Sequence, residues 1–423
     1  MTTDRRSHRQ AASPINAPRR RLLAAGLAAG AWPMLSLAAT TTAARPDDPR
    51  FVFVILRGGM DGLSAVPAPG DPAFAAARGT LAEVPGSPAL PLPGPLALHP
   101  ALAQLHGLVL AGEVVVVHAA GLPYRERSHF DAQQVLESGG SRPYELTDGW
   151  LGRALRSSGV PGIGGLALGA SVPLVLRGSE GVDSWAPSTL AEPPPDLLNR
   201  LQQLYGDDAA LGQALQRARM LHGEPAAMTA GGGMAGGMTG GTTPPRATVA
   251  LAQRAGEFLS QPSGPRVAVL DIGGWDTHAA QARILASQLS LLDDTLAALR
   301  QSLVAGGAWP HTVVVVATEF GRQVTINGTG GTDHGSGGAA FLLGGAVQGR
   351  PGGRVLADWP GLAETQRYEG RDLRITTDLR SVLRPLLAEH LKISTAALDR
   401  QVLPGSGGLA RVQGELLRGG GGV

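Results

Sequence analysis

The segment LDIGGWDTHAAQ places Asp276 and His278 two residues apart, directly after an apolar run and a pair of glycines. A carboxylate and an imidazole at this spacing can bind a metal ion together, but they can equally form the polar end of a strand. The chemistry therefore depends on which other side chains the fold brings to the same place. Asp271 is a poorer ligand candidate than Asp276, because it lies within the apolar run and before the glycine pair.

Reactive side chains also gather near other apolar runs of the chain. They are Asp61 in RGGMDGL, Ser128 in YRERSHFDAQ, Glu319 and Arg322 in TEFGR, and His334 in GGTDHGSGG. In open α/β sheets, ligands bind beyond the carboxyl ends of the strands. We therefore expect these segments to converge on one crevice.

The expected ligands are three carboxylates and two imidazoles: Asp61, Asp276, Glu319, His278 and His334. The chain has no cysteine, so nitrogen and oxygen must hold any metal. This set predicts one or two divalent ions, with zinc, manganese, magnesium and calcium all open. Two metals could hold a phosphate or sulfate ester between them. Ser128, at the expected start of a helix, would be the nucleophile, and Arg322 or Arg127 would hold the anion.

Each of these residues also has a purely structural interpretation. Asp61 with Gly62 is typical of a turn, and Ser128 could simply cap its helix. The histidines could be bound to the backbone, and a buried Glu319 could pair with Arg322. A Ser-His-Asp hydrolase would use the same residues, with His278 or His334 as the base, although the chain lacks a Gly-x-Ser-x-Gly motif.

Five continuous apolar runs predict strands that are buried on both faces, as in a parallel sheet covered by helices. They lie at residues 51–56, 113–119, 266–272, 312–318 and 339–345. Amphipathic patterns predict helices at residues 99–113, 279–304 and 376–392. Strands that alternate with helices indicate a three-layer α/β/α sandwich with a mostly parallel central sheet.

Residues 1–44 predict an export signal. Arg19, Arg20 and Arg21 resemble a twin-arginine signal, and they precede a mildly apolar stretch, residues 22–39, that ends in small residues. We expect cleavage after Ala38 or Ala44 and export of the folded protein by the twin-arginine machinery to the periplasm or the outside of the cell. The apolar stretch is short and contains Pro33, which argues against a stable membrane span, although an uncleaved anchor stays open.

Residues 50–405 are expected to form one domain, followed by a glycine-rich tail at 406–423. A glycine- and methionine-rich segment at 223–247 predicts a flexible insertion, with copper binding by its methionines as an alternative. The net charge of +2 is spread along the chain and gives no electrostatic reason to expect binding of nucleic acid.

The chain also resembles a known family in the order of its motifs. FVFVILRGGMDGL, LPYRERSHFDAQ, DGWLGRAL, DIGGWDTHAAQ, ATEFGR, GGTDHG and LGGAVQGRPGGRV look like domain-of-unknown-function family 1501 over roughly residues 50–405. That family is itself similar to the alkaline phosphatase and sulfatase superfamily, whose α/β/α sandwich binds one or two metals at the strand ends. The resemblance implies an exported metal-dependent hydrolase that acts on a small-molecule or glycan ester of phosphate or sulfate.

The resemblance further implies a division of the ligands between two metals. One metal would lie among Asp276, His278 and His334, and the other among Asp61, Glu319 and Ser128. The chain departs from the superfamily pattern at Phe320, because the superfamily has a histidine between the acidic residue and the glycine. The second metal site is therefore one ligand short, and this favours an alternative, a non-catalytic exported protein that binds a partner or a glycan. Alternatively, the segment Thr332-Asp333-His334-Gly335 could be that motif, shifted along the chain.

Overall fold

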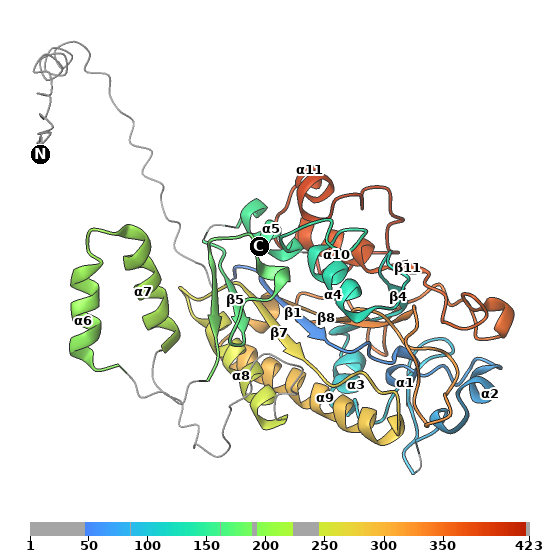
Figure 1. The fold of residues 1–423 in the computed structure, drawn as a ribbon. Coiled ribbons are helices and arrows are strands. Elements are labelled where there is room, and N and C mark those ends of the chain that lie inside the picture. The colour runs from blue at the N-terminus through green and yellow to red at the C-terminus, as the bar shows by residue number, and fades with distance from the viewer. Residues whose placement is uncertain (1–46, 85, 161, 188–192, 223–244, 420–423) are drawn as a thin grey trace, which may run out of the picture. The chain divides into compact units, whose positions relative to one another are not determined.

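A computed structural model describes residues 47–84, 86–160, 162–187, 193–222 and 245–419 (Figure 1). Internal contacts divide the chain into residues 1–41 and residues 42–423, and all described residues belong to the second unit. The predicted export signal lies outside the described residues, as does most of the predicted insertion, residues 223–244. Within the described ranges, no helix is both long enough and apolar enough to cross a membrane.

The centre of the second unit is a nine-stranded sheet with the order β10-β4-β9-β8-β1-β7-β5-β6, in which β11 also pairs with β4. All described pairings are parallel except those of β9 with β4 and β8. In this order the strands are Val355–Leu356, Val114–Gly121, Gly338–Leu343, Thr312–Thr318, Arg50–Leu56, Val267–Ile272, Gly165–Leu168 and Val182–Trp185, and β11 is Thr377–Asp378. A separate antiparallel pair joins β2 (Leu90–Pro91) to β3 (Ala97–Leu98).

The central strands are buried on both faces, as their continuous apolar sequences predict. In β1, Val52 and Val54 belong to one apolar core, whereas Phe51 and Phe53 belong to a second core on the opposite face. This division follows from the two-residue period of a strand. The fold is therefore α/β with a mostly parallel sheet between two helical layers, which confirms the predicted class.

Different helices cover the two faces (Figure 1). The core that contains Val52 also contains residues of α3 (Ala103–Leu110), α8 (Pro245–Ser260) and α9 (Gln281–Ala305). The opposite core contains residues of α4 (His129–Ser138), α5 (Trp150–Ser157) and α10 (Leu379–Glu389). The remaining α-helices are α1 (Gly62–Ala65), α2 (Phe74–Arg78), α6 (Pro195–Leu204), α7 (Ala209–His222) and α11 (Thr395–Ala397).

The three predicted helices correspond to α3, α9 and α10, with shifted ends. Helix α10 begins only at Leu379, because Asp378 is its N-cap and accepts a hydrogen bond from the Arg380 amide. Helix α3 is shorter than predicted, since residues 99–102 form a turn in which the Leu102 amide donates to the His99 carbonyl at 2.9 Å. In the described part of the predicted tail, Leu416 and Leu417 are buried, and Leu417 pairs with Val347.

The register of three neighbouring strands places several reactive segments at one edge of the sheet. Leu56, the last residue of β1, lies beside Ile272 of β7 and Thr318 of β8. Because these strands are parallel, the loops that follow them leave the sheet together. The antiparallel β9 starts at the same edge, where Gly338 pairs with Ala120 near the end of β4, so the segment before β9 also reaches it.

Candidate metal site

Four polar side chains from three separate parts of the chain meet beyond this edge of the sheet. His129 is the first residue of α4, Asp276 and His278 lie in the loop after β7, and His334 lies in the segment between β8 and β9. Glycines allow these segments to approach closely. A Cβ atom on Gly331 would lie 2.2 Å from the carbonyl carbon of His278, which is far below a normal contact distance.

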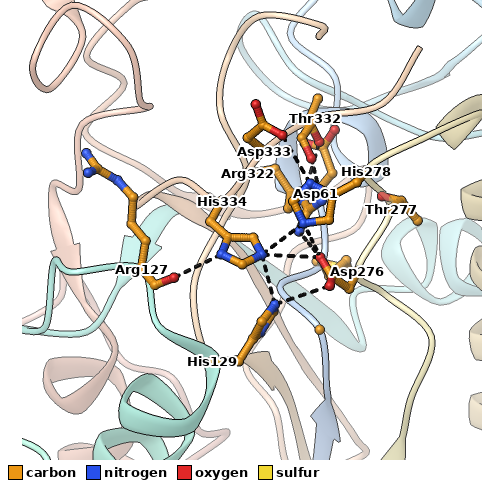
Figure 2. Close-up of polar contacts among 12 residues, drawn as sticks. Asp61, Arg127, His129, Asp276, Thr277, His278, Arg322, Thr332, Asp333 and His334 are labelled. Atoms are coloured by element: carbon orange, nitrogen blue, oxygen red, sulfur yellow. Dashed lines mark hydrogen bonds and ion pairs between the residues drawn. The ribbon is translucent and has the colours of Figure 1, made fainter. Parts of the chain in front are cut away.

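The ligand atoms of this cluster face one another (Figure 2). The Nε2 atom of His334 lies 3.0 Å from Nε2 of His129 and 3.3 Å from Oδ1 of Asp276. The Nε2 atom of His129 lies 3.6 Å from Oδ2 of Asp276, which closes a group of three residues able to hold a metal. His278 extends this group, with its Nε2 atom 2.9 Å from Asp276 Oδ1 and 3.0 Å from His334 Nε2.

The other nitrogen of each imidazole is bound to an acceptor. Nδ1 of His129 lies 2.8 Å from Glu319 Oε1, and Nδ1 of His278 lies 3.0 Å from Asp333 Oδ1. Nδ1 of His334 lies 2.9 Å from the backbone carbonyl of Arg127. Because carbonyl and carboxylate oxygens only accept hydrogen bonds, each Nδ1 carries the hydrogen in the neutral ring. The Nε2 lone pairs then point at one another and at the Asp276 carboxylate.

Such an arrangement of electron pairs is repulsive unless a proton or a metal ion lies among them. Metal-binding histidines commonly donate their second ring hydrogen to a carboxylate or a carbonyl, as all three histidines do here. Two ligands of a tetrahedral zinc ion, each about 2.0 to 2.1 Å from the metal, stand roughly 3.3 Å apart. The separations of 3.0, 3.3 and 3.6 Å among His129, His334 and Asp276 are close to that value. The residues present therefore fit a metal ion.

The electrostatic surroundings shift the pKa values of the ligands in different directions. Burial lowers the pKa of His334, and the positive charges of His129 and Arg322 lower it further, although its bond to the Arg127 carbonyl opposes this. Burial raises the pKa of Asp276, but the Arg322 guanidinium and nearby histidines bring it below its ordinary value. Burial lowers the pKa of His129, but the hydrogen bond to Glu319 and the charges of Glu319 and Asp276 raise it overall.

Glu319 lies behind the cluster instead of among the closest ligand atoms. Its carboxylate is buried and accepts hydrogen bonds at Oε1 from His129, from the Gly58 amide at 2.9 Å and from Gln133 at 3.0 Å. Burial raises the pKa of Glu319, but these donors bring it below its ordinary value. Glu319 is thus a charged acceptor that orients the His129 ring.

Asp61 is directed into the interior and has other partners. It is the N-cap of α1 and accepts hydrogen bonds from the Leu63 amide at 3.0 Å and the Ser64 hydroxyl at 2.9 Å. Arg78 and Gln281 both bind its Oδ2 atom. Burial raises the pKa of Asp61, but the Arg78 guanidinium lowers it below its ordinary value. The carboxylate is therefore neutralised by an arginine of the same chain.

The two predicted anion-binding arginines are also paired with carboxylates. Arg322 is fully buried and donates from Nη1 to Asp276 Oδ1 at 2.7 Å. Arg127 donates to Asp372 at 2.8 Å and to Glu369 at 2.6 Å. In Figure 2, the Arg127 guanidinium points away from the histidines, while its backbone carbonyl faces His334.

Ser128 directly precedes His129 and occupies the N-cap position of α4 with an extended backbone. Its hydroxyl lies beside the phenol of Tyr124. Among the described residues, no hydrogen bond joins the Ser128 hydroxyl to a histidine or to the amides of the first helical turn.

The sequence pattern did not predict His129 as a ligand, and it included Asp333 only as part of the alternative motif with His334. The signal that could have identified His129 is its place in the first turn of a helix that starts at the edge of the sheet where the reactive segments meet. Asp333 adjoins His334, and its role as the acceptor for His278 depends on a contact between loops.

Among solved structures, the chain is similar to Ps i-CgsB in complex with k-i-k-neocarrahexaose, with 12% identity, 85% of this chain and 75% of that chain covered, and a TM-score of 0.42. It is also similar to BT1596, a 2-O GAG sulfatase, with 10% identity and a TM-score of 0.39; the match covers 86% of this chain and 73% of that chain. A protein in the alkaline phosphatase superfamily from Vibrio parahaemolyticus matches with 12% identity and a TM-score of 0.37; the match covers 73% of this chain and 63% of that chain.

The comparison with curated proteins gave no match. A family model described as "Protein of unknown function (DUF1501)" matches residues 115–402, which is well over half of the chain. The matched region includes His129, Asp276, His278 and His334. The chain therefore belongs to the DUF1501 family.

Proposed function

We propose that this protein is an exported, metal-dependent hydrolase of phosphate or sulfate esters. The observation that carries the proposal is the convergence of the Nε2 atoms of His129 and His334 on the Asp276 carboxylate, with each Nδ1 atom bound to an acceptor. A donor set rich in imidazole nitrogen favours zinc over calcium and magnesium, which prefer oxygen ligands.

We propose one zinc ion, held by His129, Asp276 and His334, with His278 beside them. Three protein ligands are typical of a catalytic zinc site, which keeps a position open for water or substrate. A zinc ion bound there would supply Lewis-acid stabilisation of negative charge on the ester oxygens. The structure offers less support for a second ion, because Asp61 is neutralised by Arg78 and Glu319 is engaged with His129.

The residues of the chain have separate tasks in this proposal. Ser128, next to a zinc ligand at the start of a ten-residue helix, is the nucleophile, and the free amides at that helix end favour an anionic substrate. Arg322 keeps Asp276 ionised and oriented, and the Arg127 carbonyl keeps the hydrogen of His334 on Nδ1. The Asp276 side chain is 45% exposed, so a substrate can reach the ligands from solvent.

Export by the twin-arginine route is part of the proposal and is supported by Arg19 to Arg21 and the apolar stretch after them. That route carries folded proteins, so the metal would be bound before export. The substrate class, a small-molecule or glycan ester, is supported by the resemblance of the motif order to the alkaline phosphatase and sulfatase superfamily.

The test uses the purified chain, its metal content and two chromogenic substrates, p-nitrophenyl phosphate and p-nitrophenyl sulfate. We expect one zinc per chain and turnover that chelation abolishes and zinc restores. His334→Ala should lose both zinc and turnover, whereas Ser128→Ala should lose turnover and keep zinc. His311→Ala is the matched control, because His311 precedes β8 at the opposite edge of the sheet and should change neither.

Other outcomes would favour the alternatives. Bound zinc without turnover on any phosphate or sulfate ester would indicate a binding protein that keeps the fold. Turnover that survives chelation, together with labelling of Ser128 by a fluorophosphonate probe, would indicate a metal-independent serine hydrolase. A folded protein that binds no divalent metal would refute the proposed zinc site.

A further inference from the structure

Gln281, the first residue of α9, is completely buried, and its amide group joins four polar side chains. Its Oε1 atom accepts hydrogen bonds from the Thr277 hydroxyl at 3.0 Å and from the Thr332 hydroxyl at 2.6 Å. Its Nε2 atom donates to Asp61 and, at 3.3 Å, to the Ser64 hydroxyl.

The orientation of this amide follows from its partners. The Asp61 carboxylate, which Arg78 keeps charged, can only accept hydrogen bonds, so the NH2 group of Gln281 must face it. The amide oxygen must then face the two threonines, and both hydroxyl hydrogens are directed toward it. A flipped amide would place its oxygen against a buried carboxylate. The network therefore permits a single arrangement of Gln281.

The two threonines belong to the two loops that carry three of the four clustered residues. Thr277 lies between Asp276 and His278, and Thr332 lies two residues before His334. The loops also touch directly, because the Thr332 amide donates to the Thr277 carbonyl at 3.2 Å. A single side chain, Gln281, thus binds both loops at once from the interior.

The same network reaches Asp276 by a second route. Arg322 donates from Nε to the Thr332 hydroxyl at 3.3 Å and from Nη1 to Asp276 at 2.7 Å. Loss of the Gln281 amide would leave the Thr332 hydroxyl without its acceptor. Because that hydroxyl helps to orient Arg322, the loss would also loosen the hold of Arg322 on Asp276. At its other end, the network is fixed to the buried pair of Asp61 and Arg78.

We propose that Gln281 is a positioning residue for the metal site, which locks the two ligand loops together and so sets the affinity for zinc. This inference rests on the proposed function, because it assumes that Asp276 and His334 hold zinc. Residues that support metal ligands typically change metal affinity 10- to 100-fold when they are replaced. We therefore expect Gln281→Leu to raise the Kd for zinc by about 10-fold or more.

The experiment measures zinc binding by the full chain in competition with a chromogenic chelator, with zinc chloride as the probe. Gln288→Leu is the matched control on the same helix. Its amide oxygen is buried and has no hydrogen-bond partner among the described residues, so its loss should leave the Kd unchanged. The melting temperature of each apo variant shows whether it folds, and the Kd reports an effect that a purely structural role would not produce.

A second set of variants keeps the test decisive if Gln281→Leu does not fold. Thr332→Val removes the hydroxyl that Gln281 binds and should weaken zinc binding, whereas Thr332→Ser keeps the hydroxyl and should restore it. Thr295→Val is the control, because its buried hydroxyl bonds only to the Leu291 carbonyl among the described residues.

The outcomes separate this inference from the proposed function. Wild-type zinc affinity in folded Gln281→Leu, or equal affinity in Thr332→Val and Thr332→Ser, would overturn the positioning role while the zinc site stands. Failure of the wild-type chain to bind zinc would overturn the proposed function itself, and the positioning role with it.

Discussion

Replacing Arg78 by methionine would leave the Asp61 carboxylate buried without its cation. Both side chains are almost completely buried, with exposed fractions of 0% and 1%. Burial without a neighbouring cation raises the pKa of a carboxylate by up to roughly 3 to 5 units, and the hydrogen bonds that Asp61 keeps from Leu63, Ser64 and Gln281 reduce this rise. At pH 7, Asp61 would therefore take up a proton or stay charged at a similar cost. Protonating a carboxyl of ordinary pKa about 3.9 at pH 7 costs about 4 kcal/mol. The buried charge cannot destabilise the folded protein by more than this, because Asp61 would otherwise take up a proton.

The loss of hydrogen bonds from Arg78 to the carbonyls of Gln323 and Val324 adds a smaller cost. We therefore expect Arg78→Met to lower the free energy of unfolding at pH 7 by about 3 to 5 kcal/mol. In Arg78→Met/Asp61→Asn the buried charge is absent, so much of that stability should return.

The pH dependence provides the sharper check. In the wild type, the lowered pKa of Asp61 contributes stability that is present above the unfolded pKa and lost as the pH falls through the folded pKa. In Arg78→Met, the pKa is raised instead, so protonation at lower pH relieves the penalty. The largest loss of stability that the unpaired Asp61 charge can cause falls from about 4 kcal/mol at pH 7 to about 1.5 kcal/mol at pH 5.

The assay is urea unfolding of both proteins, followed by tryptophan fluorescence at pH 7 and pH 5, with and without a chelator. The chain has six tryptophans to report unfolding. The difference between the two proteins should be the same with the chelator, because Arg78 neutralises Asp61 without a metal. A difference in the free energy of unfolding below about 1 kcal/mol at pH 7 would refute the conclusion that Arg78 neutralises a buried Asp61 carboxylate. A difference that does not shrink at pH 5 would refute it as well.

Adding zinc at about 100 times its Kd to the apo protein should raise the free energy of unfolding by about 2.7 kcal/mol, as measured by urea unfolding, and His334→Ala should show no such gain. Glu319→Gln should raise the Kd for zinc by about 10-fold or more in the chelator competition, because a neutral amide binds the Nδ1 hydrogen of His129 less strongly than a carboxylate does. Burial lowers the pKa of His118 from 6.5 to about 4, so the unfolded chain takes up its proton first and stability falls as the pH drops through this range. The loss attributable to His118 is about 2 kcal/mol between pH 7 and pH 5, and urea unfolding of His118→Gln at the two pH values should show a correspondingly smaller decrease.

The strands of the sheet could be predicted closely from the sequence. All five predicted runs correspond to strands, and the continuous valines of β4 and β8 indicate burial on both faces. Their parallel arrangement then places the segments after β1, β7 and β8 at one edge. The antiparallel direction of β9 was not evident, and neither were the short strands β5, β6, β10 and β11, because few residues define them and their pairing depends on distant partners.

For the candidate site, the sequence determined which segments meet, and only the tertiary structure decided which atoms face one another. Asp276, His278 and His334 come together because their loops leave the same edge of the sheet. Asp61 leaves from that edge as well, but its carboxylate turns inward, because α2 brings Arg78 against it.

The roles of His129 and Glu319 could not be read from spacing either. The two residues are 190 positions apart, and a hydrogen bond between them directs the His129 ring at the cluster. Apolar runs and turns depend on neighbours along the chain, so the sequence determines the sheet and the loops that carry the reactive residues. The partner of a carboxylate or an imidazole depends on which distant segment packs against it, and that is decided only when the chain folds.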